Sequence, residues 1–190
     1  MSSILKVDQL QDSGGNAIIT SNGSGTITVN SQPFKNGITM ADQWRLSADT
    51  NQGTIGDVTT NWERPDNTGY GRIGTGLTES SGIFSFPETG VYLINHFASM
   101  QVDNGDTNAE MRLLITTDNS SYAEAASPTC GNTGSADVNL NQSAQFLFDV
   151  TNISTHKFKF DTNSFGTSTR LRGDTTVNET HFTVLRLGDT

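Results

Sequence analysis

The sequence predicts an all-β fold, either a sandwich or a barrel. About eight to ten segments alternate apolar with polar residues, recur at spacings of roughly 8 to 20 residues, and end in turn-forming residues. Hydrophobic residues make up only 33% of the 190-residue chain, and glycine alone contributes 19 residues. Short strands joined by many polar turns fit this composition, and no segment has the apolar spacing of a long helix.

The clearest pair of strands lies in residues 82–101. The first strand ends at Pro87, because proline has no N–H to donate to a sheet. Residues 87–90, Pro-Glu-Thr-Gly, then form a turn, since proline presets φ and glycine accepts a positive φ. A second strand runs from Val91 to about Val102.

Two predicted strands, 91–102 and 181–187, are apolar on both faces. On the first, Tyr92 and Ile94 share one face, whereas Leu93 points to the other. Such a strand is expected to be covered on both sides. If the two strands are neighbours in one sheet, that sheet has an outer surface that closed, symmetric oligomerisation would cover.

Weaker alternation predicts the other strands of the main domain. A first strand follows Ile38, and a short one holds Trp62 and stops before Pro65. Residues 103–106, Asp-Asn-Gly-Asp, are expected to form a hairpin turn, because Asn-Gly tolerates positive φ at both central positions. The remaining strands are centred on Met111, Leu113 and Ile115, on Asp137–Val150, and on Phe158 and Phe160.

Residues 1–36 differ from the head domain expected at 37–190. Their apolar pieces are regularly spaced but too short to enclose a core, so this extended arm has to pair with the main domain, with sister chains or with a larger assembly. We favour docking to an assembly. The residues expected to make that contact are Ile4, Leu5, Val7, Leu10, Ile18 and Ile19.

Composition excludes several classes of function. The net charge of −9 and the absence of a basic cluster argue against a nucleic-acid partner. Cys130 is the single cysteine, so no intrachain disulfide is expected. The first residues lack the apolar core of a signal peptide, and no stretch approaches the roughly 20 apolar residues of a membrane span, so we expect a protein made in a cytoplasm without membrane insertion.

No catalytic motif emerges from the sequence, and we do not expect an enzyme. Residues 69–74 match G-x-G-x-x-G, but the residues that follow do not read as the helix that a dinucleotide site needs. His96, His156 and His181 are scattered, and their spacing matches no metal motif. The nucleophile elbow G-x-S-x-G is absent as well.

Calcium is the only cofactor that the sequence brings forward. Asp103, Asp106 and Glu110 flank the predicted hairpin and would offer the oxygen ligands that Ca²⁺ prefers. The alternative is a solvated Asn-Gly turn without metal.

Three aromatic residues are candidates for recognition of a carbohydrate or another surface. Trp62, Tyr70 and Tyr122 lie in short or loop segments, where their rings would be free to stack on a sugar. Trp44, in contrast, has the periodicity of a core residue.

Residues 82–94, GIFSFPETGVYLI, resemble the signature G-x-F-x-x-P-x-x-G-x-Y-x-F/I. That signature is typical of the globular head of the antibody-binding complement subcomponent and of related tumour-necrosis-factor-like domains. The resemblance extends loosely over residues 38–190. It implies an antiparallel jelly-roll sandwich of about ten strands that assembles as a homotrimer. The implied trimer interface contains Tyr92, Ile94, Leu185 and Leu187, with Tyr92 on the sheet that faces the threefold axis.

The arm has a resemblance of its own. Ser3–Leu10, followed by Gly14–Ile18, is similar to N-terminal segments of structural proteins from tailed phages of marine bacteria. Together the two resemblances imply a virion surface protein, such as a short spike, knob or fibre-like protein, made in a bacterial cytoplasm. Its head would attach to a host glycan or protein. The alternatives are a capsid decoration protein without a receptor role and a free carbohydrate-binding module.

Overall fold

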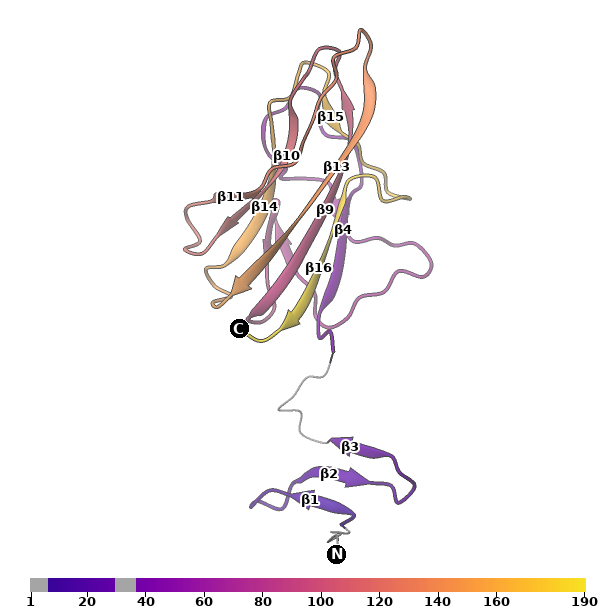
Figure 1. Cartoon of the computed structure of the whole chain (residues 1–190), viewed down its shortest axis with the longest axis vertical. Helices are drawn as coiled ribbons and strands as arrows, with labels where there is room; N and C mark the ends of the chain where they lie inside the picture. Colours follow the sequence, from indigo (N-terminus) through magenta and orange to yellow (C-terminus); the bar gives the residue numbers. More distant parts are fainter. Residues whose placement is uncertain (1–6, 30–36) are drawn as a thin grey trace, which may run out of the picture. The chain divides into compact units, whose positions relative to one another are not determined.

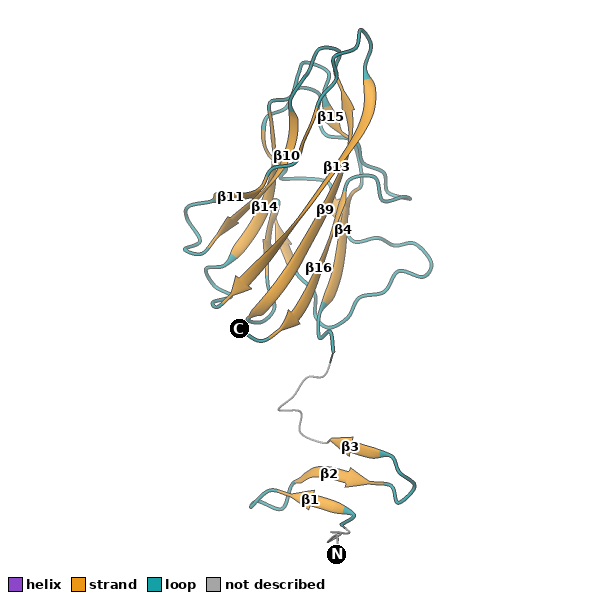
Figure 2. Cartoon of the chain, viewed as in Figure 1, coloured by secondary structure: helices purple, strands orange, loops and turns teal. Residues whose placement is uncertain are grey.

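The computed structural model describes residues 7–29 and 37–190, and strands and loops make up all of this part of the chain (Figures 1 and 2). The chain divides into two compact units, Met1–Gly37 and Ile38–Thr190. Among the described residues, no helix has the length and apolarity needed to span a bilayer.

The N-terminal unit is a small antiparallel sheet of three strands, β1 (Gln9–Gln11), β2 (Ala17–Ser21) and β3 (Ile27–Val29), in the order β1-β2-β3. Its two turns are fixed by side chains. The Asp12 carboxylate accepts the backbone N–H groups of Gly14 and Asn16, and Asn22 plays the same role in the second turn. Strands this short cannot enclose a core.

The head is a sandwich of two sheets in which every strand pair is antiparallel. The first, sheet I, has the order β13-β9-β16-β4-β6, with β15 beside β9. Its strands are β4 (Ala41–Leu46), β6 (Trp62–Glu63), β9 (Gly90–Val102), β13 (Val138–Val150), β15 (Arg170–Leu171) and β16 (His181–Gly188).

The second sheet, sheet II, has the order β11-β10-β14-β8-β7, with β12 beside β10 and β5 beside β14. Its strands are β5 (Gly56–Asp57), β7 (Thr78–Ser80), β8 (Ile83–Ser85), β10 (Ala109–Thr116), β11 (Ala123–Ala126), β12 (Thr129–Cys130) and β14 (Lys157–Asn163). The all-β sandwich is thus confirmed.

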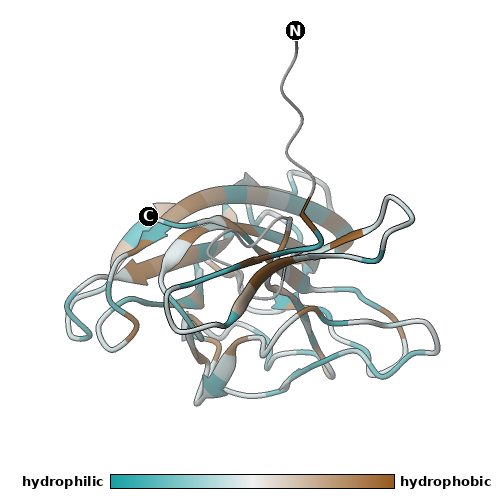
Figure 3. Ribbon diagram, turned by 90° about the horizontal axis from the view of Figure 1, so that it is seen from below, coloured by the Kyte–Doolittle hydropathy of each residue, from teal (hydrophilic) through white to brown (hydrophobic). Residues whose placement is uncertain are grey.

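Aromatic rings fill the space between the two sheets. The Phe84 ring of sheet II lies 4.7 Å from that of Phe182 and 5.4 Å from that of Trp44, both in sheet I. Edge-to-face pairs of this kind add about 0.5–1.5 kcal/mol each to the free energy gained by burying the rings. In Figure 3, hydrophobic and hydrophilic positions alternate along the strands, whereas the loops are mostly hydrophilic with a few hydrophobic positions.

Two connections cross from one sheet to the other, and one of them differs from the prediction. The turn after β8 leads into β9 of the other sheet, and the Asn104-Gly105 turn carries the chain from β9 in sheet I to β10 in sheet II. The predicted hairpin at 103–106 was therefore wrong. Turn residues determine where the backbone reverses, whereas burial determines which strands pair, and here both connections cross the sandwich.

His96 is a buried polar residue of the core. Its side chain is fully buried, and within the described structure neither ring nitrogen has a hydrogen-bond partner. The Phe160 ring lies 5.3 Å from it. Burial lowers the pKa of His96 to about 4, because the charged imidazolium loses its hydration there.

Gly82, at the start of the stretch that carries the family signature, should tolerate no side chain. Its φ is +79°, and a Cβ atom would lie 2.3 Å from the carbonyl oxygen of Val58. Gly105 has a φ of +78° with no atom within 4 Å of such a Cβ. Gly105→Ala should cost about 1–2 kcal/mol of stability through backbone strain alone. Gly82→Ala should cost distinctly more in urea unfolding, and equal losses would contradict the packing argument.

The head should lose stability in acid through His96. Its pKa is about 4 in the folded state and 6.5 ordinarily, so between these pH values the unfolded chain binds a proton that the folded chain does not. The free energy of unfolding is therefore highest above pH 6.5 and decreases as the pH falls toward 4. The loss from this group should reach about 2–3 kcal/mol at pH 4.5. Urea unfolding at pH 7.5 and 4.5 measures it. Because carboxylates contribute equally to both proteins, the difference between wild type and His96→Met isolates the histidine, and His181→Met serves as the control.

Candidate interaction surfaces

The outer face of sheet I is apolar near the start of β9. Leu93 lies opposite Leu147 of β13 on one side and opposite Leu185 of β16 on the other. We call these three side chains the leucine row. Leu147 is 58% exposed, and the neighbouring Leu187 is 51% exposed. Exposed apolar side chains that lie together on one face indicate a surface that meets a partner.

The predicted pairing of β9 with β16 is confirmed, but the inner and outer faces of β9 are the reverse of those predicted. Tyr92 and Ile94 are fully buried between the sheets, so they cannot contact a second chain. The Tyr92 ring lies 4.5 Å from that of Phe86, and its hydroxyl donates to the carbonyl of Glu88 in the turn. Because the strand is apolar on both faces in this half, alternation could not tell which face points inward. Leu185 and Leu187 do lie on the outer side.

Asp42 of β4 is a buried carboxylate that organises the loop after β6. It accepts hydrogen bonds from Nε and Nη2 of Arg64 at 3.0 and 2.9 Å, from the Leu77 backbone N–H and from the Trp44 indole. The Tyr70 hydroxyl donates to it as well, at 3.2 Å. Burial by itself would raise the pKa of Asp42, but these hydrogen bonds outweigh it and hold that pKa below its ordinary value.

Arg45, two strand positions from Gln43 on the outer face of β4, clamps two loops together. Its guanidinium is fully buried and donates to Glu63 at 2.9 Å, to Asp66 at 2.8 Å and to the Asn67 side-chain oxygen at 2.6 Å. It also donates to the carbonyl of Thr175. Arg45 therefore helps to hold residues 64–70 and 174–178 beside each other.

An open groove of about 340 Å³ lies between these two loops and β4. No charged residue lines it. Its lining combines three residues with apolar surface and four neutral polar ones, namely Pro65, Tyr70, Val177, Gln43, Asn67, Thr176 and Asn178. We call it the Tyr70 groove. Its size lies at the lower end of the range of small-molecule sites.

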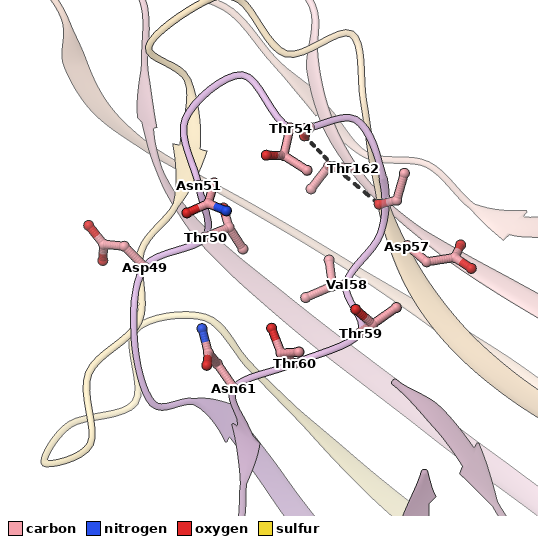
Figure 4. A pocket seen from close by; sticks show the side chains of 11 residues that line it. Asp49, Thr50, Asn51, Thr54, Asp57, Val58, Thr59, Thr60, Asn61 and Thr162 are labelled. Carbon is pink, nitrogen blue, oxygen red and sulfur yellow. Dashed lines mark hydrogen bonds between the residues drawn. The ribbon is translucent and has the colours of Figure 1, made fainter. Parts of the chain in front are cut away.

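A second hollow, of about 180 Å³, lies under the loop 49–61 (Figure 4). Its polar groups are largely engaged. The Thr162 hydroxyl contacts the carbonyls of Thr54 and Gly56, and Asp57 forms an ion pair with Lys159. No aromatic side chain lines it, so it offers no apolar platform for a ligand.

Of the three aromatics predicted for surface recognition, Tyr70 lines the groove described above. Trp62 is 9% exposed, its indole N–H donates to the Val58 carbonyl, and its ring packs against Phe84 in the core. The prediction for Trp62 was therefore wrong, because a short strand is not necessarily an exposed one. Tyr122 is partly buried, with the ammonium of Lys159 4.3 Å from its ring centre.

The three carboxylates predicted to bind calcium do not form a site. Asp106 accepts hydrogen bonds from the Gly166 N–H and the Thr169 hydroxyl, and Asp103 accepts one from Ser168. Glu110 lies in β10 and binds Asn163 instead. Among the described residues, no three His, Cys, Asp or Glu side chains lie together as a metal site. Asp103 and Asp106 thus order the loop between β14 and β15.

The residues predicted to dock the arm fall into three groups. Val7 and Leu10 are 56% and 51% exposed, and Ile27, which was not predicted, is 65% exposed. Ile18 and Ile19 are partly buried in β2. Ile4 and Leu5 lie outside the described residues.

Sequence reasoning missed the residues that build the Tyr70 groove. Asp42 and Arg45 stand inside a predicted strand, where a charge is costly unless it is paired. The presence of two charged residues in one predicted strand was therefore the signal in the sequence. It indicated that other segments of the chain had to supply partners for these charges. The partners themselves come from residues 18 to 130 positions away, which a strand pattern cannot identify.

Neither a family model nor a curated protein matches the chain. Solved structures do. The chain is similar to an Eiger TNF from S. frugiperda, with a TM-score of 0.60 and 13% identity over 81% of this chain and 96% of that one. It is also similar to murine APRIL, with a TM-score of 0.55 and 11% identity over 78% and 98%. At this identity the likeness shows the fold, and the head is a jelly roll of the tumour-necrosis-factor-like type.

Proposed function

We propose that this chain is a structural protein of a virus surface, whose N-terminal unit attaches it to the particle and whose jelly-roll head is displayed as a homotrimer. The observation that carries the proposal is the division into two units with exposed apolar side chains on each. In this proposal the two units serve assembly and display, and no residue has a catalytic role.

The leucine row supports the homotrimer. Fully burying an exposed leucine contributes about 1.5–3 kcal/mol, and the row supplies part of this for each member, since Leu147 is 58% exposed and Leu93 and Leu185 are partly buried. A closed ring buries the same face of every copy and leaves no edge for further growth. The tumour-necrosis-factor-like fold of the head agrees with this arrangement, since the family that the sequence resembles forms compact trimers.

The N-terminal unit supports attachment. A sheet with strands of three, five and three residues leaves Val7, Leu10 and Ile27 more than half exposed. Burying these side chains against another protein would stabilise both the contact and the small sheet itself. The resemblance of residues 3–18 to phage structural proteins makes the virion of a bacterial virus the proposed assembly. Whether the head then binds the host or only decorates the capsid is decided by cell binding.

The oligomer should depend on Leu147. In sedimentation, the full chain should have three times its monomer mass of 20.4 kDa, and Leu147→Asp should shift it to the monomer mass with the same β-rich circular dichroism. Ile55→Asp is the matched control, because Ile55 is also 58% exposed but lies in the loop before β5. A trimer that survives Leu147→Asp, or a monomeric wild-type chain, would contradict the proposed interface.

Incorporation into particles should depend on residues 1–37. Supplied in trans during infection, the full chain should be recovered in purified particles. The chain lacking this unit should be absent from them, and Leu10→Asp should reduce recovery at least about tenfold by removing apolar contact. Quantitative mass spectrometry of the particles measures it, with Ile55→Asp as the control for a surface change in the head. Full incorporation of the truncated chain would refute attachment through this unit.

A further inference from the structure

We propose that the Tyr70 groove binds a neutral pyranose residue of a glycan. The inference rests on the proposed display function and names the class of partner that the displayed head would recognise. Its starting observation is a groove whose lining carries no charge in a protein with a net charge of −9.

The groove is a built feature rather than a gap between mobile loops. One wall is tied to the core through the Tyr70 hydroxyl, which donates to the buried Asp42. The two loops are tied to each other by Arg45 and by the Asn67 side-chain amide, which donates to the carbonyl of Thr176 at 2.5 Å. Asn178 in turn donates to Gln43 at 3.0 Å. The residues that would contact a ligand are therefore positioned before it arrives.

The chemistry of the lining matches that of a sugar ring. A pyranose has apolar C–H surface on its faces and hydroxyl groups around its edge. Tyr70, which is partly buried, and Val177, which is 54% exposed, provide apolar surface for the faces, and the buried Pro65 borders the groove. Gln43, Asn67 and Asn178 provide amides, each of which has two N–H donors and two acceptor lone pairs. The hydrogen bonds within the groove use only part of this capacity, so donors and acceptors remain for hydroxyl groups.

Charged ligands fit less well. Two arginines beside the groove are engaged, Arg45 with Glu63 and Asp66, and Arg64 with Asp42. No positive group lines the groove, so an anionic ligand would have no ion pair to make within it. The Asp42 carboxylate already accepts hydrogen bonds from Arg64, Trp44, Leu77 and Tyr70, so it is not available to a metal ion.

Saturation-transfer NMR on the full chain tests the proposal. The probes are the methyl pyranosides of glucose, galactose, mannose and N-acetylglucosamine at millimolar concentration, with methyl glucuronide as the charged comparison. We expect transfer to at least one neutral glycoside. Tyr70→Ser should weaken that binding roughly tenfold or more, whereas Tyr70→Phe, which keeps the ring but loses the hydrogen bond to Asp42, should weaken it distinctly less. Tyr122→Ser, which removes a partly buried tyrosine elsewhere, should leave it unchanged.

Three results would overturn the proposal: no transfer to any neutral glycoside, transfer to the glucuronide alone, or undiminished binding by Tyr70→Ser. If Tyr70→Ser does not fold, the exposed Asn178→Ala replaces it and should weaken binding at least about threefold, because one amide is lost. The measurement needs neither particles nor the trimer. Glycoside binding that persists in Leu147→Asp supports the groove even where the oligomer fails, and a trimer that binds no glycoside refutes only the groove.

Discussion

The buried carboxylate of Asp42 is the interaction on which the accessible part of the head depends. A charge in this position is unfavourable unless several donors surround it, and the sequence supplies them from β4 itself, from Arg64, from Tyr70 and from the backbone before β7. Meeting that requirement folds the long connection between β6 and β7 back onto the edge of sheet I. Without this carboxylate the loop would keep its backbone bridge between Ala41 and Ile73, but Arg64 and Tyr70 would lose the acceptor that ties this wall of the groove to β4.

Arg45, on the opposite face of the same strand, is a second buried charge that needs several hydrogen-bond partners. Its fully buried guanidinium is satisfied only if residues 63–67 and the carbonyl of Thr175 arrive together. Asp174 then orders the rest of that second loop by accepting the backbone N–H groups of Thr176 and Val177. The two opposite faces of one short strand thus carry buried charges of opposite sign. Both bind residues of the connection after β6, and Arg45 also binds the carbonyl of Thr175. The groove is a consequence of satisfying both.

The sequence predicted the strands well because their signal is local. Alternation located β9, β13, β14 and β16, and turn residues located most of their ends. The sheet to which each strand belongs is not local, which is why the turns at 87–90 and 103–106 were compatible with hairpins and yet cross the sandwich. The prediction of which face of β9 points inward was wrong for a related reason. Where Tyr92 and Leu93 are both apolar, only the opposite sheet decides between them, and it selects Tyr92 because Phe86 and the Glu88 carbonyl match its ring and hydroxyl.

That reversal changes what an oligomer would bury. With Tyr92 and Ile94 inside, the outer face of sheet I offers aliphatic leucines near the start of β9 and turns polar further along, at Asn95, Thr183 and Gln43. Gln43 is also the residue of β4 that lines the Tyr70 groove. The apolar and polar halves of one sheet face therefore suit different partners. Leucines favour a second copy of the chain, because they have no hydrogen bonds to satisfy, while the amides beside Gln43 remain suited to a hydrated, hydroxyl-rich ligand. A head that uses the first half to assemble keeps the second half for recognition.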